Sequence, residues 1–564
     1  MDIYYFDTAK RYARAVTKGE VPACKWVKIA CQQFIDDLRQ QKKKEFHYRL
    51  DLGAANRVCE VIELLPHTKG RWAKDNEKLI LQPWQIFILV NLFGWLKKST
   101  GKRRYRTAYL KIPRKNGKSI LSAAIAIYML CFDGEYGAEV YSGATTEKQA
   151  WEVFRPARTM MEKSPQLQRF AKAEVWAKAV VIPGNGSRME PLIGKPGDGS
   201  SPSCAIADEY HEHDTPDLVD TMQTGMGARE QPLLIMITTA GFNISGPCYD
   251  QELEARKVLD GVVDNPDLFA LMYGIDDDDD WADPAALEKA NPNIGISVDR
   301  DFLQSQQRQA VLNANQQTRF KTKHLNAWCS ARTAWLNSHA WALCADPDLR
   351  IEEFEGEESW FILDLASKND ICAFAQVFKR RINNQDHFYA FASYYLPEDT
   401  INEIKTNQAA YRKWVIQGHL TQTDGAEIDF NEIRDEVLEL AKRFEVREII
   451  YDPWRATMLA QTLANEGATI VEHRQTVALM SPAMKELGSA IKAGRFHHDG
   501  NPITTWMASN VVAKEDAKEN IYPRKDKPEQ KIDGIVALIM GIGRAVTPVE
   551  SEDILPDDYA LMVF

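Results

Sequence analysis

Apolar and polar positions follow two different periods along this chain, and the changes between them divide it into regions. Residues 1–80 are charged and show helical spacing, so we expect an N-terminal helical extension there. Residues 81–245 alternate short apolar runs with helical stretches. Because this alternation is typical of parallel strands joined by helices, it predicts an α/β domain with a mainly parallel sheet.

A polar, acidic stretch after residue 245 interrupts the α/β pattern and separates the first domain from the regions that follow. Consecutive aspartates occupy residues 276–280, and we interpret them as a solvated loop rather than a cation site. Helical sequence over 299–325 places a lid or linker subdomain in residues 246–340. A second β-rich region covers 341–545, and an acidic, proline-containing tail covers 546–564. The tail is either disordered or a docking peptide for a partner.

Length and charge narrow the class of protein. A chain of 564 residues exceeds the ~250–300 residues at which one core stops growing, so we expect two or three domains. The net charge of −11 excludes a protein that coats nucleic acid with its whole surface, because such binding depends on Lys and Arg. Short basic stretches at 42–44, 97–106 and 379–381 are either local contacts or solvated faces.

Cysteine usage and hydropathy indicate the kind of cellular compartment in which the protein functions. The 9 cysteines are scattered and none are spaced as C-x-x-C, which favours a reducing compartment and argues against a structural zinc site. No stretch approaches the roughly 20 apolar residues that a membrane helix needs. We therefore expect no membrane segment.

The first candidate centre is a phosphate-binding loop, Lys111-Ile-Pro-Arg-Lys-Asn-Gly-Lys-Ser119, between an apolar strand and an apolar helix. The match is degenerate because the usual first glycine is replaced by Ile112. Gly117 would let the backbone approach phosphate, Lys118 would meet the β and γ oxygens, and Ser119 would hold Mg²⁺. The alternative is an ordinary strand-to-helix turn.

Two further stretches favour nucleotide hydrolysis. An apolar strand ends in Asp208 and Glu209, where the first acid would lie beside Mg²⁺ and the second would activate water. The alternative for this pair is a helix N-cap. Thr238 and Thr239 end a strand that we expect beside the acidic one, where they would sense the γ-phosphate.

The second candidate centre consists of Asp364, Asp452 and Asp533, each of which closes or follows an apolar run. Three carboxylates at the ends of neighbouring elements suit two Mg²⁺ or Mn²⁺ ions that cleave a phosphodiester. Taken singly, each aspartate is equally a cap or turn residue. Antiparallel strands expected at 373–378 and 387–392 indicate a ribonuclease-H-like sheet.

Together these motifs resemble the large terminase subunit of a tailed bacteriophage or prophage across nearly the whole chain. The stretches that carry the resemblance are Leu81-Gln-Pro-Trp-Gln85, Pro113-Arg-Lys-Asn-Gly-Lys-Ser119, Ala144-Thr-Thr-Glu-Lys-Gln-Ala150, Ala207-Asp-Glu209, Ile237-Thr-Thr-Ala-Gly241, Ala290-Asn-Pro292, Asp364-Leu-Ala-Ser-Lys-Asn-Asp370, Tyr451-Asp-Pro-Trp454 and Lys531-Ile-Asp533. Their order along the chain is as specific as their content.

The resemblance implies a viral genome-packaging motor. Its N-terminal P-loop ATPase would drive double-stranded DNA into the procapsid through the portal protein, and its C-terminal ribonuclease-H-like endonuclease would cut concatemeric DNA into genome units. The implied cofactors are ATP with Mg²⁺ at the first site and Mg²⁺ or Mn²⁺, as two ions, at the second. The implied partners are DNA, the portal, the small terminase subunit and a homo-oligomeric ring of five subunits, with a monomer as the alternative for the isolated chain. The implied location is the host cell cytoplasm, docked transiently on the procapsid.

The resemblance also assigns roles by position. It implies adenine recognition by Gln85, phosphate and Mg²⁺ binding by Arg114, Gly117, Lys118, Ser119 and Asp208, catalysis by Glu209, coupling by Thr238 and Thr239, and nuclease metal binding by Asp364, Asp452 and Asp533. Asp370 is an accessory acid or a turn cap. A neighbouring subunit would complete the ATPase site with a basic residue, for which Arg188, Lys195 and Arg229 are candidates.

Two alternatives come from other classes. A helicase-nuclease of DNA repair or recombination would need the same ATPase core, but the chain contains no second motor domain of similar size. A portal-docking scaffold with decayed sites is opposed by the intact Lys118, Glu209 and three aspartates.

Overall fold

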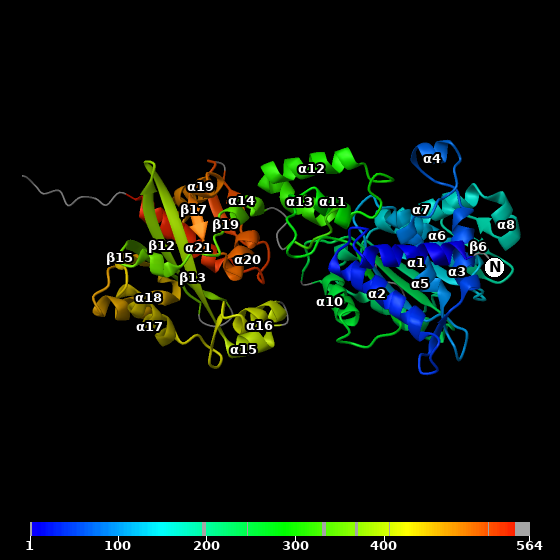
Figure 1. Cartoon of the computed structure of the whole chain (residues 1–564), viewed down its shortest axis with the longest axis horizontal. Coiled ribbons are helices and arrows are strands. Elements are labelled where there is room, and N and C mark those ends of the chain that lie inside the picture. The colour runs from blue at the N-terminus through cyan, green and yellow to red at the C-terminus, as the bar shows by residue number, and fades with distance from the viewer. Residues whose placement is uncertain are drawn as a thin grey trace, which may run out of the picture. The chain divides into compact units, whose positions relative to one another are not determined.

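The computed structural model describes residues 3–193, 199–244, 246–329, 334–366, 370–404, 407–516 and 518–547. The chain divides into two compact units, each built around its own sheet (Figure 1). The first unit contains Met1–Leu312 and Arg319–Cys329, and the second contains Asn313–Thr318 and Ser330–Phe564.

Helices precede the first sheet. They are α1 (Tyr4–Thr17), α2 (Lys25–Gln40), α3 (Leu52–Glu63), α4 (Gly70–Lys74) and α5 (Pro83–Gly94), with the short antiparallel pair β1 (Tyr48–Leu50) and β2 (Trp95–Lys97). Helix α5 is buried along most of its length because α1 and α3 both pack against it. This explains why its sequence is apolar on every side rather than amphipathic.

The first sheet has eight strands and is mainly parallel, as the sequence predicted. Their order is β10 (Leu268–Met272), β3 (Thr107–Lys111), β9 (Leu233–Thr238), β8 (Cys204–Asp208), β4 (Glu139–Ala144), β7 (Ser187–Ile193), β6 (Val180–Ile182) and β5 (Glu174–Val175). Only the β7–β6 and β6–β5 pairs are antiparallel. The edge strand β10 lies beyond residue 245, so the sheet continues into the range expected to form the lid.

The other helices of this unit connect or cover its strands. They are α6 (Lys118–Cys131), α7 (Glu147–Glu162), α8 (Pro165–Ala171), α9 (Asp217–Gly225) and α10 (Pro247–Leu259), with the 3-10 turns η1 (Tyr210–Glu212) and η2 (Met226–Ala228). Three more helices, α11 (Ala285–Ala290), α12 (Arg300–Leu312) and α13 (Ala314–His324), surround a separate small core that includes Leu287, Leu303 and Phe320.

The second sheet confirms the predicted antiparallel meander. Its order is β14 (Thr421–Thr423), β13 (Gln385–Pro397), β12 (Cys372–Ile382), β11 (Glu358–Asp364), β15 (Glu445–Tyr451) and β16 (Ile470–Glu472), and β17 (Phe496–His498) also pairs with β13. Strand β11 pairs antiparallel with β12 and parallel with β15. The remaining pair is β18 (Val512–Glu515) with β19 (Ile521–Arg524).

Two apolar cores cover the two faces of this sheet. Neighbouring residues of β11 alternate between them, since Ile362 belongs to one core and Phe361 and Leu363 to the other. The helices of the unit are η3 (Ile351–Phe354), α14 (Ser338–Leu343), α15 (Glu398–Glu403), α16 (Gln408–Ile416), α17 (Phe430–Ala441), α18 (Pro453–Asn465), α19 (Val477–Lys492), α20 (Pro502–Asn510) and α21 (Asp533–Val546). Gly541 lets α21 approach closely, because a Cβ there would lie 2.5 Å from Ile362 Cδ1.

Within the described residues, no helix is both long and apolar enough to cross a bilayer. Of the predicted tail, residues 548–564 lie outside the described residues.

Candidate functional site: a nucleotide cavity and an acidic cluster

The predicted phosphate loop joins β3 to α6, as its sequence pattern indicates. Lys115 and Gly117 have positive φ angles of 68° and 88°, which glycine adopts without steric cost. Lys118 is buried, and its Nζ donates to the backbone oxygen of Ile112 at 3.0 Å. The residue that replaces the usual glycine therefore holds the lysine through its carbonyl.

Three asparagines and a tryptophan, which the sequence did not single out for a role, fix this loop. Asn116 Nδ2 donates to Asn291 Oδ1 at 2.9 Å, and Asn116 Oδ1 accepts from the backbone N–H of Asn293 at 2.9 Å. Trp84 Nε1 donates to Asn293 Oδ1 at 3.0 Å. All four residues are buried. In the sequence, Trp84, Asn116 and Asn291 lie in stretches that carry the family resemblance, while the polar run from Asn291 to Asn293 on its own indicates a turn.

A cavity of about 670 Å³ brings the predicted nucleotide residues together. Its lining includes Gln85, Arg114, Lys118, Ser119, Asp208 and Glu209, in a volume typical of small-molecule sites. Gln85 is oriented by its own helix start, because its Oε1 accepts from the backbone N–H of Gln82 at 2.9 Å. Its Nε2 faces the loop, 3.5 Å from where a Cβ on Gly117 would lie.

The acidic pair follows β8, next to β9. Burial and the neighbouring Glu209 raise the pKa of the Asp208 carboxyl to about 7. For Glu209, burial acts to raise the pKa, but Lys118, His211 and Lys323 hold it below its ordinary value. Glu209 also has a left-handed backbone, with φ of 47° and ψ of 47°, which is strained for a residue with a side chain and is frequent at functional sites.

Thr238 and Thr239 are fully buried at the end of β9 and face the loop after Glu209. The backbone N–H of His211 donates to Thr238 Oγ1 at 3.0 Å, and His211 Nδ1 lies 3.1 Å from the same oxygen. Thr239 Oγ1 lies 3.5 Å from that ring nitrogen. His211 was not predicted from the sequence, which offers only its position two residues after Glu209.

The candidates for a basic residue acting on a neighbouring subunit lie in different settings. Arg229 is engaged within its own unit, donating to Ser201 O at 2.8 Å and to Gly137 O at 2.9 Å. Arg188 donates to the Tyr141 hydroxyl at 3.0 Å. Lys195 lies outside the described residues.

The three predicted nuclease aspartates lie at neighbouring element ends. Asp364 ends β11, Asp452 directly follows the adjacent parallel strand β15, and Asp533 begins α21. Burial, with the charges of the other two aspartates, raises the pKa of Asp364 well above its ordinary value. Burial and Asp370 raise the pKa of Asp533 to about 6.

This cluster fits a divalent metal by its chemistry. Asp533 Oδ2 is buried and has no hydrogen-bond partner among the described residues, and a bound cation would offset the burial and the neighbouring negative charges that raise these pKa values. The ligand atoms of the three aspartates do not all lie within 4.8 Å of one another, since the only described group that does is Asp276, Asp278 and Asp279. Metal binding would therefore have to draw the carboxylates together.

Lysines accompany the nuclease cluster. Lys531 forms an ion pair with Asp370, and Lys525 Nζ lies 3.8 Å from the same carboxylate. Gln475 Nε2 donates to Asp364 Oδ1 at 3.3 Å. Residues 367–369 lie outside the described residues.

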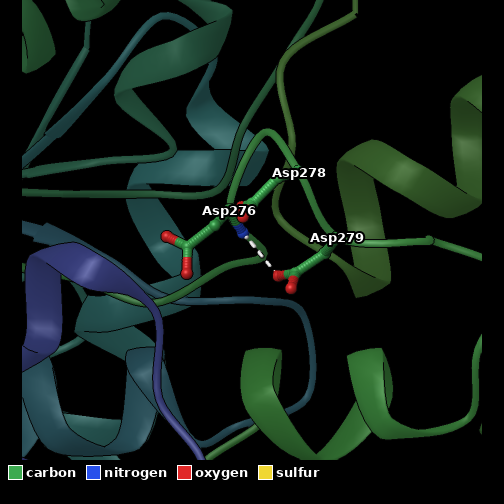
Figure 2. Close-up of side chains that lie close together, drawn as sticks. All are labelled: Asp276, Asp278 and Asp279. Atoms are coloured by element: carbon green, nitrogen blue, oxygen red, sulfur yellow. Dashed lines mark hydrogen bonds between the residues drawn. The ribbon is translucent and has the colours of Figure 1, made fainter. Parts of the chain in front are cut away.

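The acidic run forms a loop, and Figure 2 shows three of its aspartates, Asp276, Asp278 and Asp279, close together. Lys289 Nζ lies 2.6 Å from carboxylate oxygens of both Asp276 and Asp279. The backbone N–H of Asp276 donates to Asp279 Oδ2 at 2.7 Å. The Lys289 ammonium thus lies at two of the carboxylates that a cation would have to bind, which agrees with the loop interpretation.

Comparisons with known proteins find related proteins over most of the chain. Residues 83–257 match the family model "Terminase large subunit, ATPase domain", and residues 262–548 match "Terminase large subunit, endonuclease domain". Protein YmfN of Escherichia coli strain K12 is 49% identical over 369 residues, which cover 64% of this chain and 81% of that protein. The large terminase subunit of Enterobacteria phage HK97 is 29% identical over 448 residues, covering 78% and 86%. The crystal structure of the HK97 large terminase aligns with 25% identity and a TM-score of 0.43, covering 87% of this chain and 99% of that one.

Proposed function

This chain belongs to the terminase large subunits, and on that premise we propose which of its residues perform each of the two activities. The family makes it a packaging motor subunit with an ATPase domain and a metal-dependent endonuclease domain. It binds DNA, acts in a packaging complex with the portal, and uses a nucleotide and a divalent metal. Because both family models match in order along one chain, the helicase-nuclease and the inactive scaffold are not favoured.

At the ATPase site, the nucleotide occupies the cavity beside Gln85, with its phosphates at Arg114, Gly117 and Lys118. The buried ammonium of Lys118 would exchange its bond to Ile112 O for phosphate oxygens. Ser119 and Asp208 would hold Mg²⁺, which supplies charge neutralisation for the phosphates. The observation that carries this assignment is the convergence of these residues on one cavity.

Glu209 is the general base for the attacking water. Its lowered pKa keeps it ionised at neutral pH, as a base requires. Thr238 and Thr239 couple this site to the rest of the motor through the His211 loop.

At the nuclease site, Asp364, Asp452 and Asp533 hold two Mg²⁺ or Mn²⁺ ions, which supply stabilisation of the attacking and leaving oxygens. The orphaned Asp533 Oδ2 and the raised pKa values support this role. Lys531, which is buried, and Lys525 lie at Asp370 and offset its negative charge.

The finer assignments follow the family. The motor translocates double-stranded DNA as a ring of five subunits on the procapsid in the host cytoplasm, and the small terminase subunit brings it to the DNA.

DNA-stimulated ATP hydrolysis and metal-dependent plasmid cleavage, measured on one preparation, test this function. Both activities are expected in the wild type, with EDTA removing the cleavage. An intact protein with neither activity would contradict the proposal.

A further inference from the structure

We propose that His211 is a positioning residue that holds the catalytic Glu209 and links it to the coupling residue Thr238 and to Lys323 of α13. The proposal rests on the proposed ATPase function and adds a residue to its machinery. His211 is buried in the η1 turn between β8 and α9 and does not line the nucleotide cavity. It therefore acts through its neighbours rather than on the nucleotide.

The hydroxyl of Thr238 determines which ring nitrogen carries the proton. Thr238 Oγ1 donates to the backbone oxygen of Thr239 at 2.8 Å, which uses its single hydrogen. It must therefore accept from His211 Nδ1 at 3.1 Å. Burial lowers the pKa of His211, and in the neutral ring this arrangement has the proton on Nδ1 and a lone pair on Nε2.

The second ring nitrogen faces α13. Lys323 Nζ lies 3.1 Å from His211 Nε2, where an ammonium donates to the free lone pair. The backbone of the same lysine accepts from the N–H of Arg114 at 3.0 Å. One imidazole thus connects the β9 end with the helix that contacts the phosphate loop. Glu212 Oε1 also lies 3.1 Å from Nε2 and 3.9 Å from the Lys323 ammonium.

The same ring faces the catalytic carboxylate. His211 Nδ1 lies 3.3 Å from Glu209 Oε2. That oxygen is buried and makes no hydrogen bond among the described residues. The ring N–H is directed at Thr238, so Glu209 Oε2 is in electrostatic contact with the ring edge rather than hydrogen-bonded to it, and this contact orients the carboxylate.

The ring also packs closely against Gly241. Gly241 belongs to the predicted coupling stretch, and a Cβ added to it would lie 2.9 Å from His211 Cδ2. A movement of Glu209 during hydrolysis would therefore be felt by the ring, whose two nitrogens lie 3.1 Å from Thr238 Oγ1 and from Lys323 Nζ. This gives the coupling residues a physical contact with the catalytic base.

The test compares four variants of the full chain with the wild type: His211→Leu, His211→Asn, Thr238→Val and the double variant His211→Leu/Thr238→Val. For each we measure kcat and KM for DNA-stimulated ATP hydrolysis, the affinity for a non-hydrolysable ATP analogue, and the thermal transition. His213→Asn is the matched control, because His213 is buried in the same turn and packs against Tyr210.

The expected loss in kcat for His211→Leu is on the order of 100-fold, the effect of misplacing a catalytic group by about 1 Å. The affinity for the analogue stays within a few-fold, because the ring does not line the cavity. His211→Asn recovers part of kcat, since its amide nitrogen reaches toward the Nδ1 position. The double variant is no slower than His211→Leu, because the two residues act as a unit.

Three results would overturn the proposal. They are a kcat for His211→Leu within a few-fold of wild type, effects of the two single changes that multiply in the double variant, and a loss for His213→Asn as large as that for His211→Leu. If His211→Leu does not fold, the smaller changes His211→Asn and Thr238→Val decide the question through the same kcat comparison. Failure of the proposed function is distinct, since it would appear as a wild type without ATP hydrolysis or as full hydrolysis in Lys118→Ala.

Discussion

The backbone N–H of Glu209 donates to Oδ1 of Asp208 at 3.0 Å, yet these adjacent carboxyls have pKa values shifted in opposite directions. Burial and the neighbouring charge raise the pKa of Asp208 to about 7. Lys118, His211 and Lys323 outweigh burial at Glu209 and lower its pKa. The different surroundings of the two carboxyls thus suit them to different roles. Asp208 can release its proton when it binds a cation, whereas Glu209 is ionised throughout.

We predict that the KM for MgATP rises as the pH falls from 8 to 6. Asp208 takes up a proton as the pH falls through about 7, and a protonated carboxyl competes with metal binding. Steady-state hydrolysis at several pH values measures the KM, which for Asp208→Asn should be high and nearly independent of pH. The same pH dependence in Asp208→Asn would assign the titration to another group.

Lys118→Ala is expected to abolish ATP hydrolysis, because removal of a charge that faces the transferred phosphate costs roughly 100-fold or more. Plasmid cleavage by the same variant should persist, since its site lies in the other compact unit. Arg169→Ala, an exposed basic residue of α8, is the control and should hydrolyse ATP like the wild type. Full hydrolysis in Lys118→Ala would rule out the nucleotide assignment.

Asp364→Ala and Asp452→Ala should each lose Mn²⁺- or Mg²⁺-dependent plasmid cleavage while they keep ATP hydrolysis. Loss of one ligand removes the geometry that two ions need. Asp435→Ala, on an exposed part of α17, is the matched control and should cleave normally. If both activities disappear together, the change has disturbed folding rather than the metal site.

The sequence contained enough to predict the two sheets and the residues that carry charge to each site. Apolar runs that end in an acid, such as the one before Asp208, reveal both the strand and the chemistry at its end. It did not reveal that Asn116 contacts Asn293, or that Lys323 contacts His211, because these pairs are far apart in sequence and only the fold brings them together. It also placed a boundary before β10, since a short apolar run after a polar stretch does not indicate which sheet it joins.

A buried ion pair fixes the end of β3 that leads into the phosphate loop. Glu252 accepts from Lys111 Nζ at 2.6 Å and from Trp328 Nε1 at 2.7 Å. Although burial acts to raise its pKa, Lys111 and Arg256 lower it to about 2. Glu252→Ala leaves Lys111 as an unpaired buried charge, so it should cost about 3–5 kcal/mol in the stability of this unit.

Thermal unfolding followed at several pH values measures this contribution. Because the folded pKa of Glu252 lies below its ordinary value of 4.5, its stabilisation is present above pH 4.5 and is lost as the pH falls toward about 2. The difference in thermal stability between Glu252→Ala and the wild type should therefore become smaller in acid. Glu254→Ala, exposed on the same helix, should change stability by no more than about 0.5 kcal/mol, and an equal loss in both variants would contradict the ion-pair explanation.

Gly241→Ala tests the packing around His211 without removing any catalytic group. The new Cβ would lie 2.9 Å from His211 Cδ2 and 3.1 Å from its Cβ, so the ring must shift from its position beside Glu209. We expect kcat for ATP hydrolysis to fall while the affinity for a non-hydrolysable analogue is retained. Asparagine lacks the Cδ2 atom of the closest contact but keeps the Cβ, so the fall in kcat that Gly241→Ala causes should be smaller in the His211→Asn variant than in the wild type. An equal fall in both would mean that Gly241 is required for a reason other than the space it leaves for the imidazole.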